Sequence, residues 1–194
     1  IAGGFVQKNS AQIRKQLISP KHLENPVVIE AFDDSVKPMK ALAEKIEEII
    51  GKIIAEYGEK GSILLIGRYN YDMYKLYNTG AFSELPNNRV QSKKYPNANI
   101  TFMTAHSSKG LGYDNVILIN MFEGKFGFPC QIEDDPIIKL VMHEDKTMPF
   151  AEERRLFYVA MTRTKNRVFL VAPEKNPSEF LLEIKKDYKN VVLR

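Results

Sequence analysis

Residues 152–165, with the sequence EERRLFYVAMTRTK, combine three arginines with a helical pattern. The segment has no Gly or Pro, and Leu156, Val159 and Ala160 fall at helical spacing. Two arginines lie in the first turns, and Arg163 lies near the end. A guanidinium is a permanently charged planar fork that matches phosphate oxygens, including those of a phosphoryl-transfer transition state. The segment therefore predicts a helix that presents Arg163 to a phosphate, and the alternative is an ordinary solvated basic face.

A second group of polar residues, TAHSSKG at 104–110, directly follows a predicted strand. Thr104, His106 and Lys109 supply a hydroxyl, an imidazole and an ammonium group. Gly110 allows backbone N–H groups to come close to an anion. These groups suit the phosphates of a nucleotide or of a nucleic acid. The turn is not a Walker A loop, because the GxxxxGK[ST] spacing is absent, and an ordinary polar turn after a strand is the alternative.

The elements that must position these residues alternate between strands and helices. Most of the predicted strands are continuously apolar, which is typical of a parallel sheet covered on both faces. The pattern predicts an α/β fold with a largely parallel sheet, in which ligands meet the carboxyl ends of the strands. Arg68 and the 104–110 turn both follow strands directly. The expected strands are 27–32, 62–66, 100–105, 114–120 and 168–171, and the expected helices are 9–19, 36–57, 70–77, 136–142, 152–165 and 177–188.

Two parts of this pattern are more specific. Helix 36–57 has an unbroken apolar stripe, and Asp33, Asp34 and Ser35 are the expected source of its N-cap oxygen. Residues 79–99 are polar and rich in turn formers, so they predict loops with at most one weak strand near 89–91.

Composition narrows the functional classes. With 194 residues, 44% of them hydrophobic, the chain can bury one sizeable core, and the net charge of +4 permits a nucleic-acid partner. Cys130 is the only cysteine and the three histidines lie far apart, so no disulfide framework or metal site is expected. No apolar run reaches the about 18 residues that span a bilayer, and no signal peptide is visible. We expect a cytoplasmic protein without a membrane partner, and the missing initial Met suggests a fragment of a longer protein.

Three segments resemble motifs of the UvrD/Rep-type superfamily 1 DNA helicases. Residues 152–165 resemble motif VI, TAHSSKGLGYDNVILI at 104–119 resembles motif V, and ILLIGRYN at 63–70 resembles motif IV. The overall pattern is most similar to the helicase IV group of that family. The resemblance covers nearly the whole chain and implies a three-layer RecA-like domain of the P-loop NTPase type without its own Walker A. Residues 1–194 would then form one C-terminal motor domain.

The resemblance also implies a nucleotide site. Arg68 and Arg163 match arginines that contact the γ-phosphate of ATP, and Gly110 matches a nucleotide-binding position. Two positions depart from the family pattern. Gly112 stands where many members have a Glu that holds the ribose, and Gly67 stands where an aromatic residue often stacks on adenine.

A DNA track is implied as well. Thr104, His106 and Lys109 match motif V positions that contact the backbone of single-stranded DNA. Phe126 and Phe128 lie in the loop after motif V, which would pass near the strand, and their alternative role is packing within the domain. The direction of movement expected from the family is 3′ to 5′.

The implied partners follow from the missing parts. ATP with Mg²⁺ would be bound mainly by an N-terminal motor domain of the same parent protein, and single-stranded DNA would be the track. A second hypothesis is a helicase-like binding module that acts on RNA polymerase or another nucleoprotein without unwinding. A third, an unrelated nucleotide-binding α/β domain, would need a glycine-rich turn between a strand and a helix, and IAGGF at 1–5 belongs to no such unit.

Overall fold

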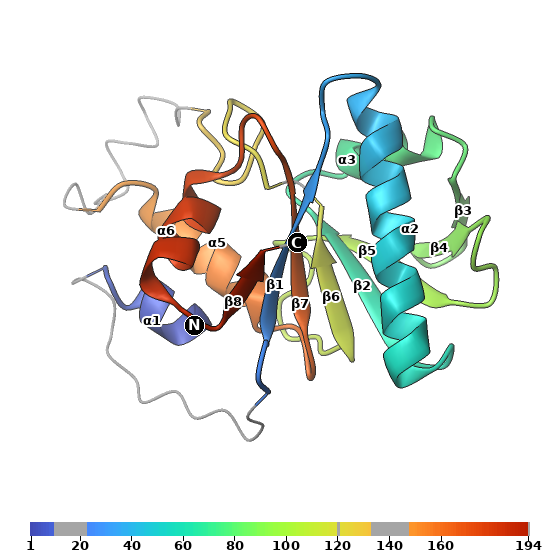
Figure 1. Ribbon diagram of the computed structural model, residues 1–194, viewed down its shortest axis with the longest axis horizontal. Helices are drawn as coiled ribbons and strands as arrows, with labels where there is room; N and C mark the ends of the chain where they lie inside the picture. Colours follow the sequence, from blue (N-terminus) through green and yellow to red (C-terminus); the bar gives the residue numbers. More distant parts are fainter. Residues whose placement is uncertain (10–22, 120, 133–147, 194) are drawn as a thin grey trace.

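The computed structural model describes residues 1–9, 23–119, 121–132 and 148–193. These residues build an eight-stranded sheet in the order β3-β4-β5-β2-β6-β7-β1-β8, with helices on both faces (Figure 1). The six strands from β5 to β8 in this order are parallel, and β3 and β4 form an antiparallel hairpin at one edge. The predicted α/β fold with a mainly parallel sheet is confirmed.

The bounds of the elements are as follows. The strands are β1 Val27–Phe32, β2 Ser62–Gly67, β3 Phe82–Leu85, β4 Arg89–Ser92, β5 Asn99–Thr104, β6 Asn115–Leu118, β7 Val168–Pro173 and β8 Val191–Leu193. The helices are α1 Ala2–Val6, α2 Pro38–Tyr57, α3 Tyr71–Tyr77, α5 Ala151–Met161 and α6 Glu179–Asp187. The expected helix at 136–142, and all but the first residue of that at 9–19, lie outside the described residues.

Two apolar layers hold the helices on the sheet. The stripe of α2 packs with α3 against one face, and its Ile46, Ile49 and Ile50 are fully buried there. On the other face, α1, α5 and α6 meet through Phe5, Phe157 and Phe180, whose ring centroids lie 5.1–5.5 Å apart. Each such buried side chain contributes about 1.5–3 kcal/mol relative to exposure. The sheet is therefore a fixed frame for the loops at its edges.

Several predicted boundaries were wrong. The N-cap of α2 is Lys37, with a φ of 54° and no side-chain cap, and Asp33 instead accepts a hydrogen bond from the backbone N–H of Ser35. Helix α6 is capped by Ser178, whose hydroxyl accepts from the N–H of Phe180. Helix α5 ends at Met161, so Arg163 follows the helix and does not belong to it.

Two strands were missed because their signals depend on tertiary pairing. β3 and β4 form a complete hairpin where loops with one weak strand were expected, and β8 lies beside β1 where no strand was expected. β3 has only two apolar residues among its four, and β8 is a run of only three residues, so neither gives a clear strand signal by itself. Among the helices that the structure describes, none has the length and apolar character needed to cross a membrane.

Candidate functional site

The carboxyl ends of β2 and β5 lie side by side and carry the first predicted residues. Gly67 is paired with Thr104, and the N–H of Ala105 donates to the carbonyl of Gly67 at 3.0 Å. Arg68 and the 104–110 turn therefore leave the sheet at one edge, as the strand-end argument predicted.

The 104–110 turn is closed by its own side chains. The Thr104 hydroxyl lies 2.9 Å from that of Ser107 and accepts from the Ser107 N–H at 3.2 Å. The buried Ser108 hydroxyl donates to the carbonyl of Ala105 at 2.8 Å. His106 and Lys109 remain exposed on the outside of this turn. A preformed turn with an outward imidazole and ammonium is suited to a phosphate backbone, because little order must be gained on binding.

Gly110 ends the turn in a conformation that favours glycine. Its φ is 84°, in the left-handed region. No atom lies within 4 Å of the position that a Cβ would take. Glycine is therefore favoured here by the backbone conformation and not by lack of space for a side chain. The chain then passes through Leu111 to the start of β6.

Arg163 forms a hydrogen bond with Leu111, the residue that follows this turn. Its Nη1 donates to the carbonyl of Leu111 at 3.1 Å, and its Nε donates to the carbonyl of Val159 at 2.9 Å. Its backbone carbonyl accepts from the N–H of Tyr113 at 2.8 Å. In the described part of the chain, the side-chain partners of Arg163 are neutral oxygens, including the hydroxyl of Thr162. Its charge is therefore left for an anion.

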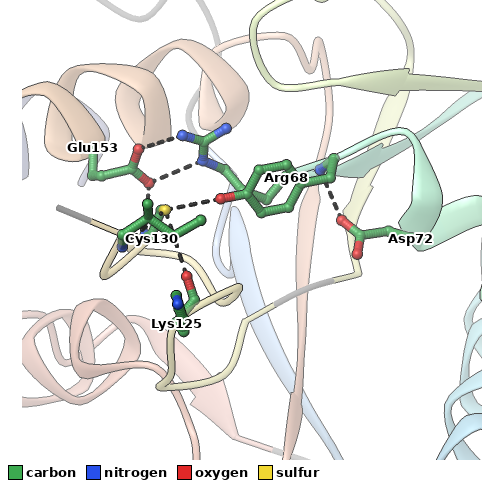
Figure 2. Close-up of polar contacts among 7 residues, drawn as sticks. Arg68, Asp72, Lys125, Cys130 and Glu153 are labelled. Atoms are coloured by element: carbon green, nitrogen blue, oxygen red, sulfur yellow. Dashed lines mark hydrogen bonds and ion pairs between the residues drawn. The ribbon is translucent and has the colours of Figure 1, made fainter. Parts of the chain in front are cut away.

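Arg68, in contrast, already has an anion. Its Nη2 and Nε donate to the two oxygens of Glu153 at 2.7 and 3.1 Å, and each side chain is only 13% exposed (Figure 2). Glu153 also accepts from the N–H of Cys130 at 2.9 Å. Burial opposes the charge of Arg68, but the hydrogen bonds and attraction of Glu153 outweigh it and raise the pKa of Arg68. This is a bidentate pair between the end of β2 and the first turn of α5.

The two predicted arginine fingers have different surroundings. The partner of Arg68, Glu153, lies in the first turn of α5, whereas Arg163 follows its last turn. The side chain of Arg163 folds back toward the helix, since its Nε donates to the carbonyl of Val159 at 2.9 Å. That both arginines contact the γ-phosphate of ATP stays a prediction, and in this structure the guanidinium of Arg68 is held by Glu153.

The other arginines of α5 serve packing and the surface. Arg154 is buried, forms a bidentate pair with Glu183 of α6, and lies over the ring of Phe5. Arg155 pairs with Glu152 at the surface. Of the three arginines in the segment, Arg163 therefore fits the predicted phosphate role best.

Phe128 is a core residue, which corrects its predicted place beside DNA. Its ring is 1% exposed and meets Phe157 at 5.5 Å between centroids, edge to face. Its carbonyl accepts from the hydroxyl of Ser178 at 2.5 Å. The alternative of packing within the domain holds for Phe128, whereas Phe126 is 46% exposed.

The two departures from the family pattern have different surroundings. A Cβ on Gly67 would lie 3.0 Å from Oδ2 of Asp72 and 3.1 Å from the ring of Phe102, so this position has no room for an aromatic residue. Asp72 is fixed there because it accepts from the N–H of Tyr69 at 2.8 Å. A Cβ on Gly112 would meet nothing within 4 Å. Gly67 is thus dictated by packing, and Gly112 is not.

Residues that the sequence did not single out complete the site. Glu153 pairs with Arg68, and Tyr71 stacks on Tyr69, the residue that the sequence offers as a substitute for the adenine-stacking aromatic. The ring of Tyr69 lies beside the guanidinium of Arg68. The described residues contain no group of three or more His, Cys, Asp or Glu side chains that could hold a metal ion. The part of the chain that the structure describes therefore does not fit a Mg²⁺ site.

Comparison with known proteins agrees with this geometry. The family model described as UvrD-like helicase C-terminal domain matches residues 66–175. DNA helicase IV of Escherichia coli (strain K12) is 29% identical over 194 residues, which are 100% of this chain and 25% of that protein. DNA helicase II of Rickettsia typhi (strain ATCC VR-144 / Wilmington) is 30% identical over 168 residues, 81% of this chain and 23% of that protein.

A solved structure supports the fold. The C-terminal domain of a possible DNA helicase from Lactobacillus plantarum WCFS1 is 15% identical, with a TM-score of 0.55 over 99% of this chain and 94% of that chain. This chain spans about a quarter of the length of the two helicases above. On the match to residues 66–175, the chain belongs to the family of UvrD-like helicase C-terminal domains.

Proposed function

We propose that residues 1–194 form the C-terminal motor domain of an ATP-dependent DNA helicase or translocase that moves 3′ to 5′ on single-stranded DNA. The observation that carries the proposal is the contact between Arg163 and Leu111. It joins the arginine after α5 to the segment that begins with the 104–110 turn. A phosphate that pulls on Arg163 would therefore also move the turn proposed to hold DNA.

On the nucleotide side, Arg163 acts as the arginine finger. ATP and Mg²⁺ are bound mainly by the N-terminal motor domain of the same protein, which faces Arg163 and Gly110. When that domain closes, the γ-phosphate oxygens replace the neutral oxygens that Arg163 now contacts. The guanidinium then stabilises the negative charge that develops on the transferred phosphoryl group. Arg68 holds α5 in place through Glu153 and is a positioning residue.

On the DNA side, the 104–110 turn contacts the backbone of a single strand. Lys109 and His106 are exposed and face solvent, so they meet phosphate oxygens directly. Thr104 is half-buried and holds the turn in shape through Ser107. Such contacts position a strand without reading its sequence, as a translocase requires.

The test is ATP hydrolysis by the whole protein with and without single-stranded DNA. Arg163→Ala is compared with Arg155→Ala, which removes a surface arginine of the same helix. We expect DNA to stimulate the wild type, Arg163→Ala to lose roughly 10³-fold or more in turnover, and Arg155→Ala to keep its turnover. Arg163→Lys should rescue poorly, because an ammonium lacks the planar fork.

The competing function is a helicase-like binding module acting on RNA polymerase or another nucleoprotein. Under it, DNA would leave ATP hydrolysis unchanged, or Arg163→Ala would match the wild type. Either result would overturn the motor proposal.

A further inference from the structure

Three aromatic rings form a cluster beyond the carboxyl end of β2, whose last residue, Gly67, is paired with Thr104. Tyr69 and Tyr71 are stacked, with centroids 5.2 Å apart and ring planes at 17°. Phe126 meets both rings edge to face, at 6.2 and 6.1 Å. We name these three residues the tyrosine cluster. Its rings come from the start of α3 and from the loop after β6, so the fold and not the sequence brings them together.

The tyrosine cluster is partly exposed, with Tyr69 and Tyr71 half-buried, and cations lie over both tyrosine rings. The ammonium of Lys75, an exposed side chain one helical turn after Tyr71, lies 4.3 Å from the centre of the Tyr71 ring. The guanidinium carbon of Arg68 lies 4.8 Å from the centre of the Tyr69 ring. Phe126 is 46% exposed. Aromatic rings interleaved with cations are typical of surfaces that bind single-stranded nucleic acid.

One ring of the cluster is fixed and one can be approached. The hydroxyl of Tyr69 donates to Sγ of Cys130 at 2.8 Å, and its ring lies beside Arg68 of the Arg68–Glu153 pair. Tyr71 stacks on Tyr69, meets Phe126 edge to face, and has the ammonium of the exposed Lys75 over its ring. A ligand can displace an exposed lysine at small cost, because a surface cation–π contact contributes only about 0.5–1 kcal/mol.

The cluster continues the proposed DNA track. Gly67 and Thr104 are paired at the ends of neighbouring strands, so the chain enters the cluster and the 104–110 turn from adjacent points. A strand whose phosphates are held by that turn would reach the cluster with its next bases.

We propose that the tyrosine cluster binds one nucleobase of single-stranded DNA by stacking on Tyr71, while Lys75 moves from the ring to a neighbouring phosphate. The proposal rests on the proposed function, since it adds a base contact to the phosphate contacts of the same track. Every base has a π-face, so this contact tolerates any sequence.

The test compares two oligothymidylates of equal length, one of which carries abasic sites in place of its bases. Affinity of the whole protein for each is measured for the wild type, Tyr71→Ala and Tyr71→Phe. We expect Tyr71→Ala to lose roughly 5- to 150-fold in affinity for the normal strand and far less for the abasic strand. Tyr71→Phe should bind as the wild type does, because the ring is kept. Lys75→Gln should lower the slope of log affinity against log salt by about 1.

Tyr74→Ala is the matched control. Tyr74 is a 57% exposed tyrosine of the same helix that contacts Tyr77 and not the cluster. Equal losses for Tyr71→Ala on both strands, or equal losses for Tyr71→Ala and Tyr74→Ala, would overturn the stacking proposal. If the wild type fails to bind single-stranded DNA at all, the proposed function fails. If it binds and only the Tyr71 effect is absent, the proposed function stands without this contact.

Discussion

Arg68 and Glu153 form a two-pronged ion pair that fastens the end of β2 to the first turn of α5, with N–O distances of 2.7 and 3.1 Å. Glu153 also holds the backbone of Cys130, so three segments far apart in the sequence meet at one carboxylate. The pair lies beside the tyrosine cluster, and Arg163 lies at the other end of the same helix. α5 therefore links the side of the tyrosine cluster to Arg163, the proposed arginine finger.

The first prediction concerns this pair. Arg68→Ala leaves Glu153 largely buried without its guanidinium, so unfolding free energy should fall by on the order of 2–3 kcal/mol. Glu153→Ala should cost a similar amount. The double variant should lose clearly less than the sum, because neither charge is then left unpaired. Urea denaturation of the four proteins measures this. Additive losses, or an ATPase defect in Arg68→Ala at unchanged stability, would instead indicate that Arg68 acts directly on phosphate.

The second prediction separates the two glycines that depart from the family pattern. Gly67→Ala places a methyl group 3.0–3.1 Å from Asp72 and Phe102, and Asp72 is anchored by the Tyr69 N–H. Overpacking of this kind should lower unfolding free energy by about 1–3 kcal/mol. In Gly112→Ala the added methyl group has no atom within 4 Å, so the unfolding free energy should change by no more than about 0.5 kcal/mol. Thermal denaturation compares them, and equal losses would refute the packing account of Gly67.

The sequence predicted the elements whose signals are local. The unbroken apolar stripe predicted α2, and the run VVIEAF predicted β1 with its observed bounds. The cap of α2 was wrong because Lys37 adopts a left-handed conformation, and no side-chain pattern identifies that choice. β8 was missed because its three residues become a strand only by pairing with β1.

The candidate site also has parts that could be predicted from the sequence and parts that could not. Strand ends could be predicted, so Arg68 and the 104–110 turn were expected at the same edge. The Arg68–Glu153 pair joins residues 85 positions apart, and the burial of Phe128 depends on rings of α5 and α6. Contacts of this kind follow from how helices pack on the sheet, and a single sequence does not encode them in any local pattern.

The third prediction is a pH dependence at the start of β6. Asp114 accepts from the N–H and hydroxyl of Ser62 at 2.9 and 2.8 Å, and then from Lys165 at 3.1 Å. These bonds, those of Ser62 first, lower the pKa of Asp114 below its ordinary value. A carboxylate with a lower pKa in the folded state stabilises the protein above its unfolded pKa, about 3.9, and loses that contribution as pH falls through the folded value.

Asp114→Asn should therefore destabilise the protein by about 1 kcal/mol at pH 7, since the carboxylate is partly exposed to solvent. The difference in unfolding free energy between wild type and Asp114→Asn should become smaller as the pH falls from 5 toward 3. Urea denaturation at a series of pH values measures it. If the difference in unfolding free energy between wild type and Asp114→Asn is the same at every pH, the effect comes from the shape of the side chain and not from its charge.

The last prediction tests the phosphate contact of the 104–110 turn. Lys109 is exposed at the carboxyl edge of the sheet, and one lysine on a phosphate releases about one counterion on binding. Lys109→Ala should weaken binding of single-stranded DNA to a similar degree for all sequences and lower the salt slope by about 1. Lys60→Ala removes an equally exposed lysine that precedes β2 at the opposite edge, and it should leave the slope unchanged. Titrations at several salt concentrations compare them. Equal slopes for both variants would mean that the basic charge acts at long range, and that this turn does not hold the strand.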